Sequence, residues 1–534
     1  MIVMKRFAIY TFILLSLSAC IKNDLPLPVI TPRITAMDVE GATKVEINSD
    51  KQIVYVTLDE TVDIKSVNIR DISFEDERTT SSLDTSVPHD MSKDISLTLS
   101  IYQDYNWKIV ANQPIERYFT VVGQVGETNI DAVNHRVITY VGASVDKRNI
   151  TVSSIKLGPR DITTYSPDIA QMKNFINGLD VLVTSFGRTE KWRIFVENTT
   201  TVVEMKSINA WTAVAWVSAS GVADRQNGFK YRKQGDSEWI DVANITADGG
   251  MFSACIEGLN PLTTYECYAY SGNDTTEIET FTTEEARQMP NSGFESISND
   301  ESDKYYSFYD PLSTIKENQT KWWCTGNKGS TTVGSSYSIT NPDSNDKKEG
   351  QYSVRLESQY VIVKFAAGNI FVGEFAGLVG TSGGCVNFGR PFTLRPRKLS
   401  LWLKYENGPI DRFNSAPDND PVKKGDMDRC QVFVALGDWD YRDYGGTPNS
   451  PVQVNTTDKS TFFNPNAEEV IGYGSYVSDK ATDGWIKVEI PITYNSVSRK
   501  PTHIIVSCAS SMLGDYFTGS TSSKLWVDDM RLEY

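Results

Sequence analysis

Apolar and polar positions alternate along most of this chain with a period of two residues. The stretches 59–74, 95–121 and 399–405 alternate, or run in Val, Ile, Thr and aromatic residues, as a half-buried pleated strand does. Few stretches show the period of 3.6 residues that marks an amphipathic helix. The pattern therefore predicts an all-β protein.

Turn residues separate these short runs throughout a chain of 534 residues with 36 Gly and 21 Pro. Such a chain is too long for one hydrophobic core. A Trp-basic-Ile signature occurs at Trp107-Lys108-Ile109 and again, about one small domain later, at Trp192-Arg193-Ile194. We interpret this repeat as two tandem immunoglobulin-like β-sandwiches, each with its Trp in the core; a binding role for the two Trp is the alternative.

The third segment carries a sharper motif, Gly258-Leu259-Asn260-Pro261-Leu262-Thr263-Thr264-Tyr265. It resembles a fibronectin type III domain, and the resemblance implies that the Tyr265 hydroxyl bonds back to the chain as a corner tyrosine. Such domains most often serve as spacers or protein-contact modules. The fold alone therefore predicts no chemistry for this segment.

The start of the chain predicts its compartment. Lys5-Arg6 precede an apolar run at 7–17, and Leu17-Ser18-Ala19-Cys20 resembles the lipobox of a bacterial lipoprotein. The run is too short to span a bilayer, so we expect a cleaved signal and an acylated Cys20; a coincidental cysteine after an ordinary signal is the alternative. The residues 21–24 partly resemble the export signal of Bacteroidota lipoproteins, which predicts a lipid anchor in the outer membrane, facing the cell exterior.

The net charge of −16 argues against nucleic acid as a partner, because binding to phosphates needs Lys/Arg-rich faces. It says little about neutral sugars. Six cysteines follow Cys20, without metal-ligand spacing, and their spacing leaves open whether they are buried thiols or form disulfides. They are Cys255, Cys267, Cys324, Cys385, Cys430 and Cys508.

From Met289 onward the composition is rich in Gly, Asn and aromatic residues. The sequence blocks of this part are Asn291-Ser292-Gly293-Phe294-Glu295, Gly389-Arg390-Pro391-Phe392-Thr393-Leu394-Arg395-Pro396, Gly514-Asp515-Tyr516-Phe517-Thr518-Gly519 and Val527-Asp528-Asp529. In this order they resemble the putative carbohydrate-metabolism domain of Bacteroidota surface lipoproteins. The resemblance implies a β-jelly roll similar to carbohydrate-binding modules and concanavalin-like glycan enzymes.

Four aromatic residues of this domain are candidate ligand contacts. Trp439, Tyr441 and Tyr444 lie in an Asp-rich loop at 437–446, and a ring face beside fixed charges is what sugar recognition needs. Trp402 lies on the polar phase of the 399–405 strand, where it either stacks on a sugar or is covered by a loop.

The last strand contains Asp528-Asp529, and the alternation changes phase there, which predicts a β-bulge. Two adjacent carboxylates either bind a hard cation or form an exposed acidic strand end. Modules that the domain resembles often hold a structural calcium between an early glutamate and a late Asp pair. The resemblance therefore implies a calcium site at Glu295, Asp528 and Asp529.

The catalytic residues, if any, are unknown from sequence. The segment 380–384 fits the Gly-x-Ser-x-Gly pattern, but it lacks the strand-to-helix context and a histidine base. A glycosidase needs only two facing carboxylates, and Asp438 and Asp440 beside Trp439 are the first candidates. Because they lie two apart on an extended segment they would share one face, which favours binding over catalysis.

These observations predict tandem immunoglobulin-like and fibronectin III-like sandwiches followed by a C-terminal jelly roll. The predicted boundaries are 1–19 for the signal peptide, 20–33 for a tether, 34–118, 119–203 and 204–285 for the three sandwiches, and 286–534 for the jelly roll. We expect a cell-surface lipoprotein whose jelly roll binds glycan in carbohydrate acquisition, with surface proteins as further partners. The alternatives are a glycoside hydrolase or lyase in the same domain, and a structural or adhesive surface protein.

Overall fold

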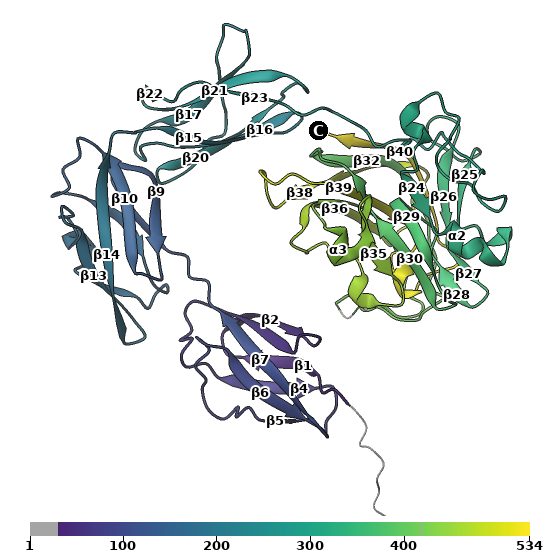
Figure 1. Ribbon diagram of the computed structural model, residues 1–534, viewed down its shortest axis with the longest axis horizontal. Helices are drawn as coiled ribbons and strands as arrows, with labels where there is room; N and C mark the ends of the chain where they lie inside the picture. The colour runs from purple at the N-terminus through teal and green to yellow at the C-terminus, as the bar shows by residue number, and fades with distance from the viewer. Residues whose placement is uncertain (1–29, 418) are drawn as a thin grey trace, which may run out of the picture. The chain divides into compact units, whose positions relative to one another are not determined.

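The computed structural model describes residues 30–417 and 419–534. The predicted signal peptide, Cys20 and most of the predicted tether lie outside the described residues. The chain divides into two compact units, Met1–Thr200 and Thr201–Tyr534. Nearly every regular element is a strand (Figure 1), which confirms the all-β fold class. None of the described helices has the length and apolar character that crossing a membrane requires.

The first unit begins with a sandwich of two sheets around one hydrophobic core. One sheet pairs β1 (Ile34–Val39) with β4 (Ile69–Phe74). The other has the order β2 (Ala42–Asn48), β3 (Ile53–Leu58), β7 (Asp104–Asn112), β6 (Ile95–Ser100) and β5 (Thr80–Ser81). Trp107 of β7 is fully buried in this core, as predicted.

A second sandwich follows, with a core of its own. Its larger sheet has the order β12 (Thr164–Ser166), β13 (Leu179–Ser185), β14 (Arg188–Thr199), β10 (Arg136–Gly142) and β9 (Gln124–Asp131), and its smaller sheet pairs β11 (Val152–Lys156) with β8 (Tyr118–Val121). Strand β14 carries the buried Trp192 and pairs in parallel with β10, just as β7 carries Trp107 and pairs in parallel with β3. The sequence repeat is therefore also a repeat of topology.

The second unit begins with a third sandwich. Its sheets are β15 (Glu204–Ala210), β16 (Val214–Ser220), β20 (Met251–Glu257) and β19 (Thr246–Asp248), and β18 (Ile240–Asp241), β17 (Asn227–Lys233), β21 (Thr264–Ser271) and β22 (Asp274–Thr275), with β23 (Glu279–Thr282) beside β21. The N–H of Asn260 donates to the hydroxyl oxygen of Tyr265 at 2.9 Å, which confirms the predicted tyrosine corner.

The C-terminal domain packs two large sheets face to face. The first has the order β34 (Gly445–Thr447), β35 (Ser450–Asn455), β30 (Gly383–Phe388), β29 (Asn369–Val379), β39 (His503–Ala509), β33 (Cys430–Gly437), β36 (Val470–Ser478) and β38 (Thr493–Tyr494), joined by β24 (Trp323–Thr325) and β31 (Arg390–Pro391). The second has the order β25 (Thr340–Asp343), β26 (Ser353–Glu357), β40 (Lys524–Glu533), β32 (Lys398–Glu406) and β37 (Ile486–Pro491). A hairpin of β27 (Gln359–Val361) and β28 (Lys364–Ala366) stands apart from both.

Short helical turns occupy the connections. They are η1 (Ile169–Gln171) in the second sandwich, and η2 (Lys316–Gln319), α2 (Asn327–Ser330), η3 (Thr331–Val333), η4 (Ser335–Tyr337), α3 (Tyr441–Tyr444), η5 (Lys459–Thr461) and η6 (Gly514–Tyr516) in the C-terminal domain.

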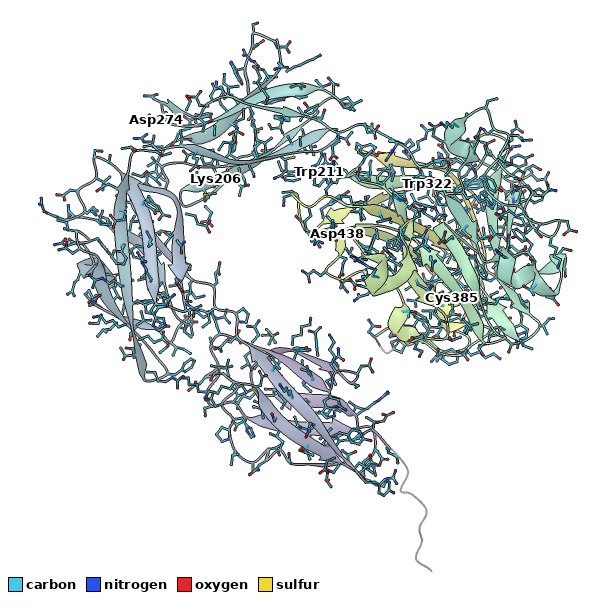
Figure 2. The ribbon with its side chains drawn as sticks, viewed as in Figure 1. Lys206, Trp211, Asp274, Trp322, Cys385 and Asp438 are labelled. Atoms are coloured by element: carbon cyan, nitrogen blue, oxygen red, sulfur yellow. The ribbon has the colours of Figure 1, made fainter. Side chains whose placement is uncertain are left out.

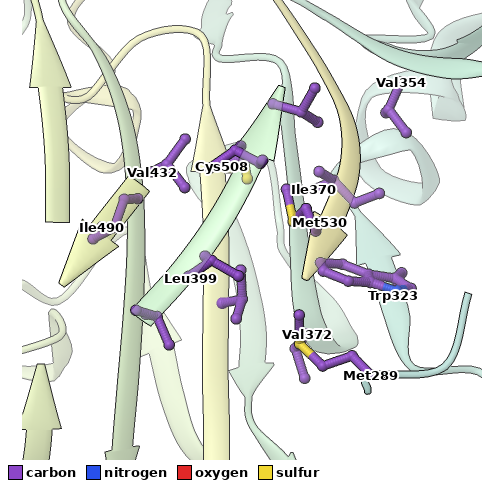
Figure 3. Close-up of a cluster of buried hydrophobic side chains, with 14 of the residues drawn as sticks. Met289, Trp323, Val354, Ile370, Val372, Leu399, Val432, Ile490, Cys508 and Met530 are labelled. Carbon is purple, nitrogen blue, oxygen red and sulfur yellow. The ribbon is translucent and has the colours of Figure 1, made fainter. Parts of the chain in front are cut away.

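Between the two large sheets lies the main core of the domain, part of which is drawn in Figure 3. Leu399, Leu401, Leu403 and Tyr405 of β32 all point into it, as their alternation predicts. Strand β33 differs, because Val432 and Val434 belong to this core while Phe433 belongs to a second apolar cluster on the other face of the sheet. This strand is therefore buried on both faces.

Strand β40 contains the predicted bulge. Its register against β32 shifts between the pairs Ser400–Arg531 and Trp402–Asp528, and Asp529 adopts a φ of 44°. The bulge keeps both Val527 and Met530 in the core, where strict alternation would have turned one of them outward.

The third sandwich is fixed to the C-terminal domain by Trp211 (labelled in Figure 2) and Arg395. The indole N–H of Trp211 donates to the carbonyl of Val497 at 3.0 Å. The buried guanidinium of Arg395 donates to the carbonyl of Ala210 at 2.8 Å and pairs with Glu284 at 3.1 Å. One arginine of the Gly389–Pro396 block thus serves a domain junction.

Candidate functional site

The predicted aromatic loop at 437–446 covers a sheet instead of forming a ligand platform. Trp439 is 4% exposed and packs in the second apolar cluster, with its ring 6.3 Å from that of Phe463. The Tyr444 hydroxyl donates to Glu469 at 2.6 Å, and the side chain packs against the same cluster. Only Tyr441 of the three aromatics is exposed. Of these three candidate ligand contacts, Trp439 is therefore covered by protein, and Tyr441 is the one that is open to solvent.

The two first catalytic candidates of this loop are both held by arginines. Asp438 (labelled in Figure 2) accepts hydrogen bonds from one nitrogen of Arg499 at 2.7 and 2.9 Å. Asp440 caps α3 by accepting from the N–H of Arg442 at 2.9 Å, and the Arg442 side chain pairs with it. Hydrogen bonds from Arg442 lower the pKa of Asp440 to about 2. Such a carboxylate is a poor general acid or base near neutral pH.

Trp402 is half-buried under a loop. The Lys348 ammonium lies 4.1 Å from the centroid of the Trp402 ring. Of the two predicted arrangements, stacking on a sugar or covering by a loop, the structure has the covered one.

Glu295 and Asp528 face the same loop, 348–352. Asp528 accepts from the N–H groups of Lys348 and Glu349 at 2.7 and 2.9 Å, and Glu295 accepts from the N–H of Gln351 at 2.7 Å. Burial raises the pKa of Asp528, and the charge of Glu295 adds to this rise. The oxygens of both carboxylates thus already accept from backbone N–H groups, and a hard cation bound there, which would relieve the raised pKa of Asp528, stays a prediction.

Asp529 does not fit the calcium site. Its carboxylate pairs with Arg531 at 3.1 Å, on the outward side of the bulge. Within residues 30–417 and 419–534, no group of three His, Cys, Asp or Glu side chains could hold a metal ion. A calcium ion at Glu295 and Asp528 would therefore also need backbone carbonyls or water as ligands.

A hollow of the C-terminal domain that combines aromatic and charged side chains lies at η6, and we call it the η6 pocket. Its volume is about 280 Å³. Its lining comes from five segments and comprises Lys364, Ser382, Asn414, Ser415, Thr456, Thr457, Lys459, Phe462, Asp515, Tyr516 and Phe517. Three aromatic rings, two ammonium groups and one carboxylate therefore meet in one hollow.

The aromatic residues of the η6 pocket are held in place by specific contacts. The rings of Phe462 and Tyr516 meet edge to face, with centroids 5.0 Å apart. Phe517 adopts a φ of 54°, a left-handed conformation that costs a residue with a side chain about 1–3 kcal/mol. The Lys364 ammonium lies 4.0 Å from the centroid of the Phe517 ring. Strain of this kind is typical of functional sites.

Hydrogen bonds tie the surrounding loops to η6. The Thr518 hydroxyl accepts from the N–H of Asn414 at 3.0 Å and donates to the carbonyl of Ser415 at 2.7 Å. On the opposite side, the Thr456 hydroxyl accepts from the N–H of Gly384 at 3.0 Å. A Cβ at Gly383 would lie 2.3 Å from this hydroxyl oxygen, so a side chain there would displace the Thr456 hydroxyl. The pocket walls are thus fixed by the fold.

Asp515 supplies the single carboxylate of the η6 pocket. The side chain retains a surface open to solvent, yet protein atoms around the carboxyl remove part of its water and raise its pKa to about 6. Among the described residues the carboxyl has no hydrogen bond or ion pair. It is therefore available to a ligand.

Exposed apolar side chains lie next to the lining residues of the η6 pocket, on the β27–β28 hairpin and on the loop that contains Arg412 and Phe413. Tyr360 and Phe413 are 43% and 47% exposed, and Ile362 and Val363 at the hairpin tip are exposed further. Arg412 lies 4.5 Å from the centroid of the Tyr360 ring and so links the two segments. This rim provides ring faces beyond the pocket itself.

A second hollow of about 200 Å³ lies beside β24 and β29. It is lined by two glutamates, Glu301 and Glu374, but each is paired with a cation. Lys321 binds Glu301, and Arg390 lies 3.6 Å from Glu374. The Thr447 hydroxyl also donates to Glu374, at 2.8 Å. This network stabilises the sheet edge and leaves neither carboxylate free of partners.

Ser382 of the Gly-x-Ser-x-Gly pattern lines the η6 pocket, in the turn between β29 and β30. Ser382 therefore lies in the turn of a β-hairpin and not in a strand-to-helix turn. His503 lies elsewhere, bound to the carbonyl of Pro448 at 3.0 Å. The six cysteines of the described residues are all free thiols.

The sequence did not identify the η6 pocket as a site. Asp515, Tyr516 and Phe517 belong to a family motif in the sequence, whereas Lys364 and Lys459 belong to no motif. The available signal was an acidic residue followed by two aromatics between glycines, which is as typical of sugar recognition as the 437–446 loop. What the sequence lacked was the three-dimensional meeting of segments about 150 residues apart.

Residues 293–533 match the family model described as the putative carbohydrate metabolism domain. The structure is similar to that of a putative glycoside hydrolase from Bacteroides thetaiotaomicron, with 16% identity and a TM-score of 0.30 over 78% of this chain and 95% of that chain. It is similar to a putative glycoside hydrolase from Bacteroides vulgatus, with 18% identity and a TM-score of 0.31 over 43% and 91%. A carbohydrate-binding module, CBM28, specific for non-crystalline cellulose, gives 11% identity and a TM-score of 0.19 over 40% and 88%.

No curated protein matches the chain. The solved structures, at these TM-scores, carry no argument about activity. The family match covers the C-terminal domain almost from end to end, so this part of the chain is a carbohydrate-related domain.

Proposed function

We propose that the C-terminal domain binds glycan in the η6 pocket and that the chain thereby takes part in carbohydrate acquisition. The observation that carries the proposal is the meeting of Phe462, Tyr516 and Phe517 with the carboxyl of Asp515, which has no partner among the described residues, in a hollow of about 280 Å³. Ring faces bind the C–H surface of a sugar, and fixed polar groups bind its hydroxyls. The exposed rim at Tyr360 and Phe413 suits further sugar units of the same glycan.

Binding is favoured over hydrolysis because the described residues supply the η6 pocket with one carboxylate, that of Asp515. A glycosidase needs two, placed across the scissile bond. The alternative function, a glycoside hydrolase or lyase, is favoured only by Glu301 and Glu374, which line the second hollow together. Both glutamates are already paired with cations, which makes them less suited to act as general acid and general base.

Titration of the full chain with a panel of polysaccharides, with reducing-sugar release measured alongside, tests the proposal. We expect binding without release. Tyr516→Ala should weaken binding about three- to tenfold through the lost ring contact, whereas Tyr441→Ala, exposed on α3 outside the pocket, should leave it unchanged. Release of sugar that Glu374→Gln abolishes would favour the hydrolase. If the chain neither binds a polysaccharide nor releases sugar, a structural or adhesive function would be favoured.

We also propose that Cys20 is acylated and anchors the protein in the outer membrane, with the sandwiches, the third of them fibronectin III-like, as spacers or contacts for surface proteins. The support is the basic flank, the short apolar run and the small residues before Cys20. Metabolic labelling with an alkyne fatty acid should mark the wild-type chain and not Cys20→Ser. Protease added to intact cells should cleave the chain if it faces the exterior.

A further inference from the structure

We propose that the η6 pocket selects glycans that carry an anionic substituent, a carboxylate or a sulfate on the sugar. The inference rests on the proposed glycan-binding function of this pocket and specifies the class of its ligand. It follows from the positions of two lysines and of the Ser382 hydroxyl in the pocket.

Two ammonium groups reach the η6 pocket from different elements, Lys364 from β28 and Lys459 from η5. Each is placed over an aromatic ring of the pocket. Lys364 Nζ lies 4.0 Å from the centroid of Phe517, and Lys459 Nζ lies 5.3 Å from that of Tyr516. Neither lysine has an ion pair with a carboxylate in the part of the chain that the structure describes.

These contacts restrict where the two positive charges lie. A cation over a ring face is held by the ring quadrupole, so the ammonium stays at the pocket wall instead of extending into solvent. A sugar that stacks on the same aromatic surface then brings its substituents within reach of both ammonium groups. An anionic substituent would receive charge-assisted hydrogen bonds, which are stronger than those to a neutral hydroxyl.

The local charge of the η6 pocket differs from that of the chain. The whole protein carries −16, whereas the pocket has two lysines against the single Asp515. The overall field repels anions, but it is screened within about 8–10 Å at moderate salt. Recognition of an anion by this chain therefore requires a local cationic site, and the η6 pocket provides one.

A hydroxyl donor supports the same ligand class. The side chain of Ser382 lines the pocket, and within residues 30–417 and 419–534 its hydroxyl makes no hydrogen bond. Thr456, by contrast, is already bound to the backbone of Gly384. Ser382 can donate to a carboxylate or sulfate oxygen while the lysines supply charge.

The experiment is calorimetric titration of the full chain with three probes: neutral cello-oligosaccharides, oligogalacturonates and chondroitin sulfate oligosaccharides. We expect at least one anionic probe to bind at least about tenfold more tightly than the neutral one, and its affinity to fall as salt rises. The two anionic probes distinguish a carboxylate from a sulfate.

Lysine variants locate the effect. Lys364→Gln and Lys459→Gln should each weaken binding of the anionic probe about tenfold, while Lys364→Arg, which keeps the charge, should stay near wild type. Lys316→Gln, an exposed lysine of η2 outside the pocket, is the matched control and should change nothing. Melting curves of each variant verify that it is folded.

Two results would overturn the inference. If the neutral probe binds as tightly as the anionic ones and the Lys→Gln variants bind like wild type, anion selection is rejected while glycan binding stands. If none of the probes binds and none binds in the wider polysaccharide panel, the proposed function is rejected together with its specificity.

Discussion

Asp528 of β40 lies directly opposite Trp402 of β32, and one loop covers both side chains. The backbone N–H groups of Lys348 and Glu349 donate to the Asp528 carboxylate, and the side chain of Lys348 lies over the Trp402 ring. A tryptophan on the polar phase of a strand is explained here by its cover. The arrangement also brings a buried carboxylate next to Glu295.

Calcium should stabilise the protein through this pair of carboxylates. The ion would neutralise Asp528, whose pKa is raised by burial, and Glu295, whose charge acts on it. A hundredfold excess over the dissociation constant adds about 2.7 kcal/mol, which raises the melting temperature of a domain of this size by roughly 5–10 °C. Melting curves of the full chain with calcium and with a chelator measure the shift.

Variants assign the calcium effect to residues. Asp528→Asn and Glu295→Gln should abolish the shift, whereas Asp529→Asn, whose native carboxylate pairs with Arg531, should keep it. Identical melting curves with calcium and with chelator would reject the site.

Trp439 and Tyr441 should behave oppositely, although both were predicted to bind a ligand. Trp439→Ala removes a core side chain and should cost about 3–5 kcal/mol of unfolding free energy. Tyr441→Ala removes an exposed ring and should change it by less than about 0.5 kcal/mol. Denaturant unfolding measures both. Reduced glycan affinity of a fully folded Tyr441→Ala protein would restore the loop as a contact.

These two residues show where sequence reasoning succeeds and where it ends. Alternation identified the strands, the core face of β32 and the bulge at Asp529, because each depends on neighbours along the chain. The role of the 437–446 loop could not be predicted in this way, because it depends on β33 being apolar on both faces. Trp439 of the loop packs on the outer face of that strand, in the cluster that contains Phe433. The η6 pocket was hidden for the same reason, since Lys364, Lys459 and Asp515 meet only after folding.

Binding of an anionic glycan should strengthen as the pH falls from about 7 to 5. Asp515 has a pKa of about 6, raised from 3.8 by loss of water, and above this pH its charge opposes an anion. The other titratable side chains that line the pocket among the described residues are those of Lys364, Lys459 and Tyr516. The carboxylate of a uronate, with a pKa of about 3.5, stays ionised between pH 7 and pH 5.

Asp515→Asn should remove this pH dependence, as titrations at pH 5, 6 and 7 would show. In the protein without ligand, the raised pKa of Asp515 also determines whether stability rises or falls with pH. Because the folded-state pKa lies above the usual value of 3.8, the free energy of unfolding falls as the pH rises from about 4 to about 6. Affinity that weakens below pH 6 would instead indicate that the Asp515 carboxylate accepts from the hydroxyls of a neutral sugar.

At the junction of the third sandwich and the C-terminal domain, replacing Arg395 should lower the free energy of unfolding far more than replacing its neighbour Arg397. Arg395 and Glu284 form a buried pair, with side chains 6% and 10% exposed. Among the described residues, Arg395→Met leaves Glu284 with only Lys500, whose half-exposed ammonium lies 3.0 Å from the carboxylate. Weakening a buried pair costs up to about 3–5 kcal/mol, so Arg395→Met should destabilise the second unit. Arg397 pairs with Glu257 at 3.3 Å in the open, with both side chains more than half exposed, and Arg397→Met should cost at most about 1 kcal/mol. The double variant Arg395→Met with Glu284→Leu should recover part of the loss, because the buried carboxylate is removed and only the half-exposed Lys500 loses its partner. Denaturant unfolding measures these differences, and Trp211, which packs 5.0 Å from the Arg395 guanidinium, is one of the 11 tryptophans that contribute to the fluorescence signal. Equal effects of the two single variants would mean that the junction does not depend on this buried pair.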